Sequence, residues 1–194
     1  MPGGRVMEGK SKFTTETNLT EEEKKILHNI ALTAITKKLR NESPVLPMAK
    51  TDILNEKRGA FVSLHKNGQL RGCIGYVHGV KPLAKAINDM AIAAAFQDPR
   101  FSTLQENELS DLDIEISVLT PMKQISNINE IEVGKHGLMM IKGPYSGLLL
   151  PQVATQYNWD RQTFLSETCH KAGLPIDAWK DDNTEIYIFS AEIF

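Results

Sequence analysis

The spacing of hydrophobic positions along the chain follows two different periods, and each period predicts a different kind of element. In residues 20–40 the apolar side chains recur every three to four positions, which predicts an amphipathic helix. Thr20 and Glu23 match a capping box at its start. A second helix is expected over 82–97, and its end, 91–96, is apolar nearly all round and should be buried.

Alternation with a period of two predicts strands elsewhere. An Asn-Gly dipeptide joins two of them, 60–66 and 69–76, into a hairpin. If its loop has two residues, Val62 lies opposite Cys73 and Leu64 opposite Arg71. Further along, the expected elements are a strand at 113–119, β-like pieces at 128–133, 137–142 and 147–150, a turn at 143–146, a helical region from Pro151, a helix over 159–172 with Asn158 as N-cap and Gly173 as C-cap, and a closing strand at 185–189.

This order of elements indicates an α+β fold. Strands joined by hairpins pair in antiparallel fashion, so the sheets should be largely antiparallel. A chain of 194 residues with 41% hydrophobic residues is long enough for one substantial core, or for two small cores that share an interface.

Charge and composition exclude several classes of protein. The net charge of −2 argues against a nucleic-acid partner. The longest apolar run, near 90–96, is far shorter than the ~20 residues of a membrane span. Residues 1–17 contain no apolar signal segment and should form a loose tail. The two cysteines lie far apart, so we expect a cytoplasmic protein with reduced thiols.

The segment Leu70-Arg71-Gly72-Cys73-Ile74-Gly75 combines a cation, a thiol and two glycines in one predicted strand. Residues two apart share a face, so Arg71 and Cys73 would project together, with Cα atoms ~6.5 Å apart. Leu70 and Ile74 would form an apolar underside with Gly72 between them. Glycines inside a strand often mark a place where a ligand or another backbone comes close.

Cys73 is a candidate nucleophile, because a neighbouring cation such as Arg71 favours the reactive thiolate. A base would have to come from elsewhere in the fold; the candidates are His65, His78, His136 and His170. The alternative for Cys73 is a small buried side chain. Cys169 falls on the apolar stripe of its predicted helix and is expected in the core.

Three charged residues have both a functional and a structural interpretation. Arg71 could bind a carboxylate or phosphate, or could form a salt bridge with Glu115 or another acid and hold the subdomains of the fold together. Glu115 projects opposite its apolar neighbours, as a general acid or base or simply as a solvated strand residue. Arg100 follows the turn that stops the second helix, and could bind a ligand or cap that helix.

No cofactor or metal motif is present in the sequence. The five histidines show no metal-ligand spacing, and there is neither a dinucleotide-binding glycine pattern nor a Walker loop. We therefore expect no metal and no cofactor.

Taken together, a set of short motifs resembles the AMMECR domain family. They occur in family order over about residues 20–194, and comprise Leu70 to Gly75, Asp98-Pro99-Arg100-Phe101, Ile114 to Pro121, His136-Gly137-Leu138, Gly147 to Ala154, Phe164-Leu165 and Cys169 to Pro175. Residues 1–17 fall outside the resemblance.

The resemblance implies two subdomains, each with a mainly antiparallel sheet and flanking helices. We map the larger onto 18–120 plus 184–194 and the smaller onto 121–183, where a series of short β-like pieces begins. It also implies a cleft between them that the hexapeptide faces, so the expected ligand-binding residues are Leu70, Arg71, Gly72, Cys73, Ile74, Gly75 and Arg100.

No biochemical activity is established for that family, and the resemblance associates some prokaryotic members with Memo-like and radical-SAM proteins. Two functions therefore stay open. One is an enzyme acting on a peptide-like or small organic substrate, with Cys73 or Glu115 as the catalytic group. The other is a non-catalytic module that binds a protein segment. The sequence identifies neither the substrate nor the partner.

Overall fold

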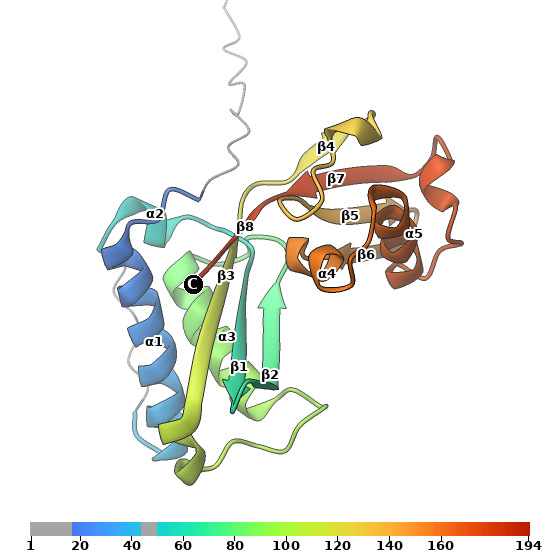
Figure 1. Ribbon diagram of the computed structural model, residues 1–194. Helices are drawn as coiled ribbons and strands as arrows, with labels where there is room; N and C mark the ends of the chain where they lie inside the picture. The colour runs from blue at the N-terminus through green and yellow to red at the C-terminus, as the bar shows by residue number, and fades with distance from the viewer. Residues whose placement is uncertain (1–16, 44–49) are drawn as a thin grey trace, which may run out of the picture.

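The computed structural model describes residues 17–43 and 50–194, and shows two four-stranded sheets with helices packed against each (Figure 1). The strand order is β2-β1-β3-β8 in the first sheet and β4-β7-β5-β6 in the second. Neighbouring strands are antiparallel throughout the described residues. The predicted α+β class is therefore confirmed.

The first sheet and its helices come mainly from the first two thirds of the chain. Their bounds are α1 (Glu21–Leu39), α2 (Asp52–Asn55), β1 (Ala60–Lys66), β2 (Gln69–Tyr76), α3 (Leu83–Phe96), the 3₁₀ turn η1 (Glu106–Asp111), β3 (Leu112–Leu119) and β8 (Ala191–Ile193). The predicted capping box is present, because the side chain of Thr20 accepts from the Glu23 N–H and the Glu23 carboxylate accepts from the Thr20 N–H.

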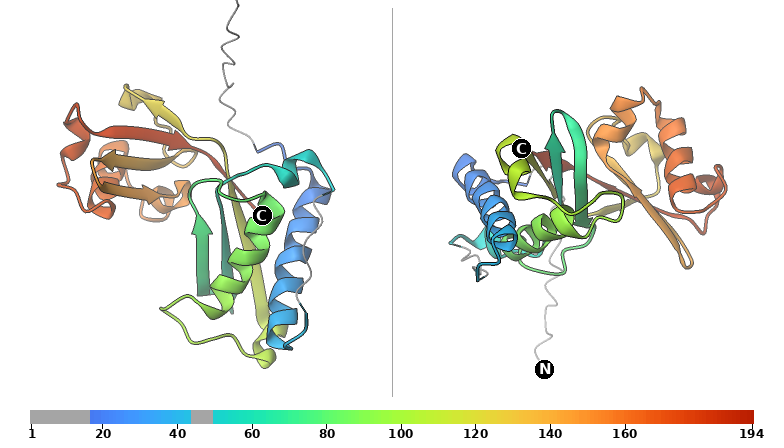
Figure 2. Two further views of the ribbon diagram at one scale, coloured as in Figure 1. Left: turned by 180° about the vertical axis from the view of Figure 1, so that it is seen from behind. Right: turned by 90° about the horizontal axis from the view of Figure 1, so that it is seen from below.

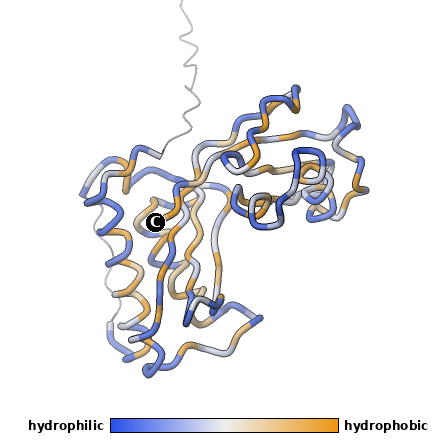
Figure 3. The backbone as a smooth tube through the Cα atoms, viewed as in Figure 1, coloured by the Kyte–Doolittle hydropathy of each residue, from blue (hydrophilic) through white to orange (hydrophobic). Residues whose placement is uncertain are grey.

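Helices α1 and α3 cover the same face of the first sheet (Figure 2). The apolar side of α1 is turned towards α3 and the sheet (Figure 3), and the alanine-rich end of α3 is largely buried, as its composition predicts. From β1, Ala60, Val62 and Leu64 are fully buried in this core. The residues between them face the other side of the sheet, which no described helix covers (Figure 2).

The second sheet is smaller and carries α4 and α5. Its elements are β4 (Lys123–Ile125), the 3₁₀ turn η2 (Ile128–Glu130), β5 (Gly137–Lys142), β6 (Tyr145–Leu149), α4 (Pro151–Gln156), α5 (Arg161–Lys171), the 3₁₀ turn η3 (Ala178–Lys180) and β7 (Glu185–Phe189). Cys169 is fully buried in the core between α5 and this sheet, as its helical position predicts.

The chain passes between the two sheets twice, and the two crossings are tied to each other. The Thr120 N–H donates to the Ser190 carbonyl, and the Ser190 N–H donates to the Thr120 hydroxyl, both at 2.9 Å. The division into 18–120 plus 184–194 and 121–183 stays a prediction. The sheets depart from it at one strand, because β7 pairs with β4 and β5 of the second sheet.

Local details differ from the sequence prediction in several places. Strand β6 begins at Tyr145, inside the predicted turn at 143–146, and strands β4 and β8 were not predicted. Residues 128–130 form a 3₁₀ turn in place of a strand, since the side chain of Asn127 accepts from the Asn129 N–H at 2.9 Å. Helix α5 begins two residues late, because its N-cap is Asp160 in place of Asn158. The predicted tail lies outside the described residues except for Thr17, which is buried.

None of the helices in the described ranges is both long enough and apolar enough to cross a membrane.

Candidate functional site

The hexapeptide lies in β2, at one edge of the first sheet, and its register differs from the predicted one. His65 pairs with Leu70, but the next pair is Leu64 with Gly72, so Arg71 is an extra residue that bulges out of the strand. Beyond this bulge Val62 pairs with Ile74 and Ser63 with Cys73. The predicted pairs of Val62 with Cys73 and Leu64 with Arg71 are therefore wrong, because a bulge moves every later residue by one position.

The bulge also decides which way the side chains of β2 point. Ile74 packs against the core beneath α3, whereas Leu70 is 40% exposed, so the two do not form a shared apolar underside. Cys73 lies opposite Ser63, on the face of the sheet that α1 and α3 leave uncovered. We call this surface the open face and define it by five half-buried residues, Phe61, Ser63, His65, Cys73 and Glu115.

The two glycines of the hexapeptide are explained by close packing inside the first sheet and its helices. A Cβ atom at Gly72 would lie 2.1 Å from the carbonyl oxygen of Ala94 in α3. A Cβ at Gly75 would lie 2.2 Å from the ring of Phe61 in β1. The close neighbours are thus a helix and a side chain of the same sheet unit, and the expected ligand or second subdomain is not what requires these glycines.

Arg71 is engaged by the loop that runs beside the free edge of β2. Its Nε and Nη2 donate to the two carboxylate oxygens of Glu108 at 3.1 and 3.0 Å, and its Nη1 donates to the Ser102 carbonyl at 2.8 Å. The side chains of Arg71 and Glu108 are 13% and 12% exposed. Arg71 holds the pKa of Glu108 at about 2, helped by the Gln105 N–H and by Lys66. The acid that pairs with Arg71 is thus Glu108 and not Glu115.

Cys73, Ser63 and Glu115 form a row across three strands of the open face. Ser63 pairs with Cys73 on one side and with Glu115 on the other. The Ser63 hydroxyl donates to the Cys73 Sγ at 3.2 Å. Side chains at directly opposed positions have Cβ atoms roughly 5 Å apart, so a ligand over Ser63 can reach both of its neighbours.

Asp98 and Arg100 fix the backbone of Cys73 from the edge of the sheet. Buried Asp98 accepts from the Cys73 N–H at 2.9 Å and from Arg100 Nη2 at 2.7 Å. Its pKa is held well below the usual range, chiefly by Arg100 and also by the Cys73 N–H. Arg100 Nη2 also donates to the Cys73 carbonyl at 3.4 Å, in place of the predicted alternative of capping α3.

The guanidinium of Arg100 is the cation that reaches towards Cys73. Its side chain is 56% exposed, and its hydrogen bond to Asp98 raises the pKa of Arg100. No histidine pairs with Cys73 in the described strands. His65 lies on the same face two residues further along β1, while His136 and His170 belong to the second sheet and its helix.

A different set of polar atoms lies where the two sheets meet. His136 and Ser190 are buried, and His136 Nε2, Gln152 Oε1 and Ser190 Oγ are enclosed without a hydrogen-bond partner in the described residues. Sequence reasoning did not select Ser63, Asp98, Glu108, Gln152 or Ser190 as site residues. Asp98 and Gln152 stood inside motifs of the family resemblance, which is the signal that could have found them.

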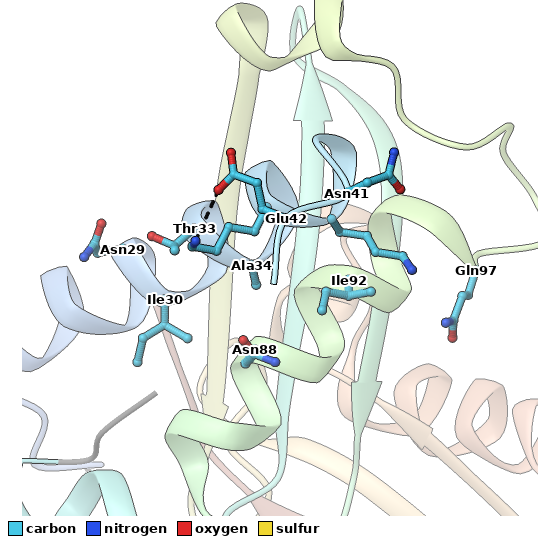
Figure 4. A pocket seen from close by; sticks show the side chains of 11 residues that line it. Asn29, Ile30, Thr33, Ala34, Asn41, Glu42, Asn88, Ile92 and Gln97 are labelled. Carbon is cyan, nitrogen blue, oxygen red and sulfur yellow. Dashed lines mark hydrogen bonds and ion pairs between the residues drawn. The ribbon is translucent and has the colours of Figure 1, made fainter. Parts of the chain in front are cut away.

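A cavity with described walls lies away from these residues. It has a volume of about 510 Å³ and opens between α1 and α3, with Ile30, Ala34 and Ile92 as its apolar lining (Figure 4). A hollow of about 340 Å³ surrounds the hairpin turn from Lys66 to Arg71. Neither lies between the two sheets, so the cleft stays a prediction. Within the described ranges, no three His, Cys, Asp or Glu side chains gather in a way that could hold a metal ion.

Comparison with known proteins gives a consistent result. A family model described as AMMECR1 matches residues 28–194. A protein of Methanothermobacter thermautotrophicus is 45% identical over 183 residues, which cover 91% of this chain and 95% of that protein. One of Nanoarchaeum equitans is 41% identical over 175 residues, covering 87% and 97%. The crystal structure of an uncharacterized protein from Pyrococcus horikoshii superimposes with a TM-score of 0.82 at 41% identity, and covers 90% of this chain and 92% of that one.

Proposed function

Since the chain belongs to the AMMECR1 family, whose relatives compared above carry names without an activity, we propose a function from the geometry: the protein binds a peptide-like or small organic ligand on the open face, beside Cys73. In this proposal Arg100 engages an anionic group of the ligand. Ser63, Cys73 and Glu115 contact the part of the ligand that lies across the strands.

One observation carries the proposal. Arg71 and both glycines of the hexapeptide are occupied by contacts inside the first sheet unit, whereas the thiol of Cys73 is directed to the helix-free face. Arg100 is 56% exposed although it pairs with Asp98, so its outer donors are available to a ligand. Guanidinium groups recognise carboxylates and phosphates through two parallel hydrogen bonds, which favours an anionic ligand group here.

A titration tests this binding function. N-acetylglycine, which has one amide and one carboxylate, is added to the ¹⁵N-labelled full chain. We expect saturable chemical-shift changes at Ser63, Cys73 and Glu115, and about tenfold weaker binding by Arg100→Gln, because a charge-assisted hydrogen bond is worth about 1.5–3 kcal/mol. Arg40→Gln is the matched control, since Arg40 is 53% exposed and also pairs with one acid. Equal affinity of Arg100→Gln and the unmodified protein would remove the proposal.

A thiol-dependent enzyme is the second candidate, favoured by the hydrogen bond from Ser63 to Cys73. A donor at 3.2 Å and a nearby guanidinium both stabilise a thiolate, which is the nucleophilic form of cysteine. The rate of alkylation of Cys73 by iodoacetamide, measured against pH, tests this candidate. Ser63→Ala should slow the reaction at neutral pH. An unchanged alkylation rate of Cys73 in Ser63→Ala would contradict the thiol-dependent enzyme and leave ligand binding as the proposed function.

A further inference from the structure

Three enclosed polar atoms at the junction of the two sheets call for a chemical explanation. His136 Nε2, Gln152 Oε1 and Ser190 Oγ have no hydrogen-bond partner within the described residues. Buried polar atoms in folded proteins are almost always paired, and each exception points to a functional role or to an additional bound group. His136 and Ser190 are 3% and 5% exposed.

All three residues adjoin one end of the central strand β5. Gly137 of β5 pairs with Phe189 of β7, so His136 and Ser190 each adjoin the last pair of that ladder. Leu138 also pairs with Leu149 of β6, two residues before α4 begins at Pro151, so Gln152 follows close to the same end of β5. The crossing segment at Thr120 closes the group through its two hydrogen bonds to Ser190.

The hydrogen-bonding capacity of the three side chains is defined. The Glu132 N–H donates to His136 Nδ1 at 3.1 Å, which assigns the proton of the neutral ring to Nε2. Nε2–H is therefore a donor directed away from that bond. Ser190 Oγ–H is a second possible donor, and Gln152 Oε1 is an acceptor. Two donors and one acceptor complement the carbonyl oxygen and the N–H of one amide group.

We propose that His136, Gln152 and Ser190 form a subsite for an amide group of the ligand. The amide oxygen accepts from His136 Nε2–H and from the Ser190 hydroxyl, and the amide N–H donates to Gln152 Oε1. This inference rests on the proposed function in one respect, that the ligand is peptide-like, and it narrows the ligand to a molecule with at least one carboxamide or peptide bond.

Access to this subsite depends on Gln152. Its Oε1 is enclosed, yet the residue as a whole is only half-buried, so part of this side chain borders solvent and we expect the ligand to enter here. A neutral amide suits the position better than an ion, because transfer of a charge into a buried site is far more costly than transfer of a hydrogen-bonded polar group.

N-acetylglycinamide, the neutral carboxamide counterpart of N-acetylglycine, is the probe for this subsite. Titrated into the full chain, it should shift the His136 ring ¹⁵N signals and the Gln152 side-chain amide in a saturable way. Gln152→Leu, which keeps a similar size and removes the acceptor, should weaken binding about tenfold. Gln156→Leu, an exposed position on the same helix, should bind as the unmodified protein does.

Ser190→Ala distinguishes an amide subsite from a pocket for ordered water only. If the hydroxyl is unpartnered until a ligand binds, its removal should leave the melting temperature unchanged or raised and should weaken binding of the probe. A lowered melting temperature without any binding of N-acetylglycinamide means an ordered water only, and overturns the inference. Equal affinity of Gln152→Leu and Gln156→Leu overturns it too.

The two proposals fail separately. Binding of N-acetylglycinamide that depends on Gln152 supports the subsite even if N-acetylglycine binding does not depend on Arg100, in which case the proposed role of Arg100 fails alone. The converse result is that N-acetylglycine binding depends on Arg100 while Gln152→Leu changes the affinity for neither probe. That result supports the open-face site and rejects the amide subsite.

Discussion

The ion pair between Arg71 and Glu108 gives the sharpest test of how the hexapeptide works. Glu108→Gln keeps the shape of the side chain and removes its charge. The pKa of Glu108 is lowered from the ordinary 4.5 to about 2. Each tenfold change in a protonation equilibrium corresponds to about 1.4 kcal/mol, so the interaction is worth up to about 3 kcal/mol at neutral pH, and solvent screening near the surface reduces this towards about 2 kcal/mol.

We therefore expect Glu108→Gln to lower the melting temperature by roughly 4–8 °C, since about 2 kcal/mol shifts a chain of this size by that amount. The difference should depend on pH with a definite sign. A carboxyl whose pKa is depressed on folding stabilises the fold above its unfolded pKa. The difference between Glu108→Gln and the unmodified protein should be full above pH 4.5 and should shrink as the pH falls towards 2.

Glu106→Gln is the matched control for this experiment. Glu106 lies in the same 3₁₀ turn and pairs with Arg40 at 3.0 Å, but both side chains are more than half exposed. Exposed pairs contribute less than about 1 kcal/mol. If urea unfolding at pH 7 gives equal free energies for the two variants, Arg71 is not held by Glu108. The structural role of Arg71 is then refuted, and Arg71 returns as a ligand-binding residue.

Packing and burial lead to three further predictions. Gly72→Ala should lower the free energy of unfolding, measured with urea, by about 3 kcal/mol, because the added methyl meets the backbone of α3. Gly143→Ala should lower it by only about 1 kcal/mol, because Gly143 has open space around it and only its positive φ opposes a side chain. Burial lowers the pKa of His136, so as the pH falls this histidine takes up a proton in the unfolded chain before it does so in the folded one. The free energy of unfolding should therefore fall as the pH drops below about 6.5. His136→Gln should flatten this pH dependence between about pH 7 and 5. Iodoacetamide should label half-buried Cys73 faster than buried Cys169, whose pKa is raised by burial, and equal rates by mass spectrometry would contradict this difference in accessibility.

The local elements were predictable because their causes are local. The Thr20 capping box, the Asn-Gly turn and the alternation in β1 and β2 depend on residues only a few positions apart. The bulge at Arg71 was not predictable from spacing. It allows the Arg71 side chain to reach Glu108, 37 residues further along the chain, while Gly72 packs under α3.

The candidate site likewise contains residues that the sequence indicated and residues that only the fold brings to it. The sequence pointed to Cys73, Glu115 and Arg100, since a thiol and two charges in strand or turn positions are visible without a fold. It could not show that Ser63 lies between Cys73 and Glu115, because cross-strand neighbours depend on register. Nor could it show that His136, Gln152 and Ser190 each enclose a polar atom without a hydrogen-bond partner in the described residues, because burial depends on how distant segments pack.

The α+β class, most element boundaries and the segment that marks the family could be read from the sequence, because periodicity, caps and turns are short-range properties. The roles of the residues within that segment required the fold. It turned Arg71 into an ion-pair partner of Glu108, and it assigned the two glycines to helix and ring contacts. It left Cys73 on the open face beside Arg100. The physical reason is that charge pairing, close approach and burial are set by residues distant in sequence, whose positions follow from sheet register and helix packing.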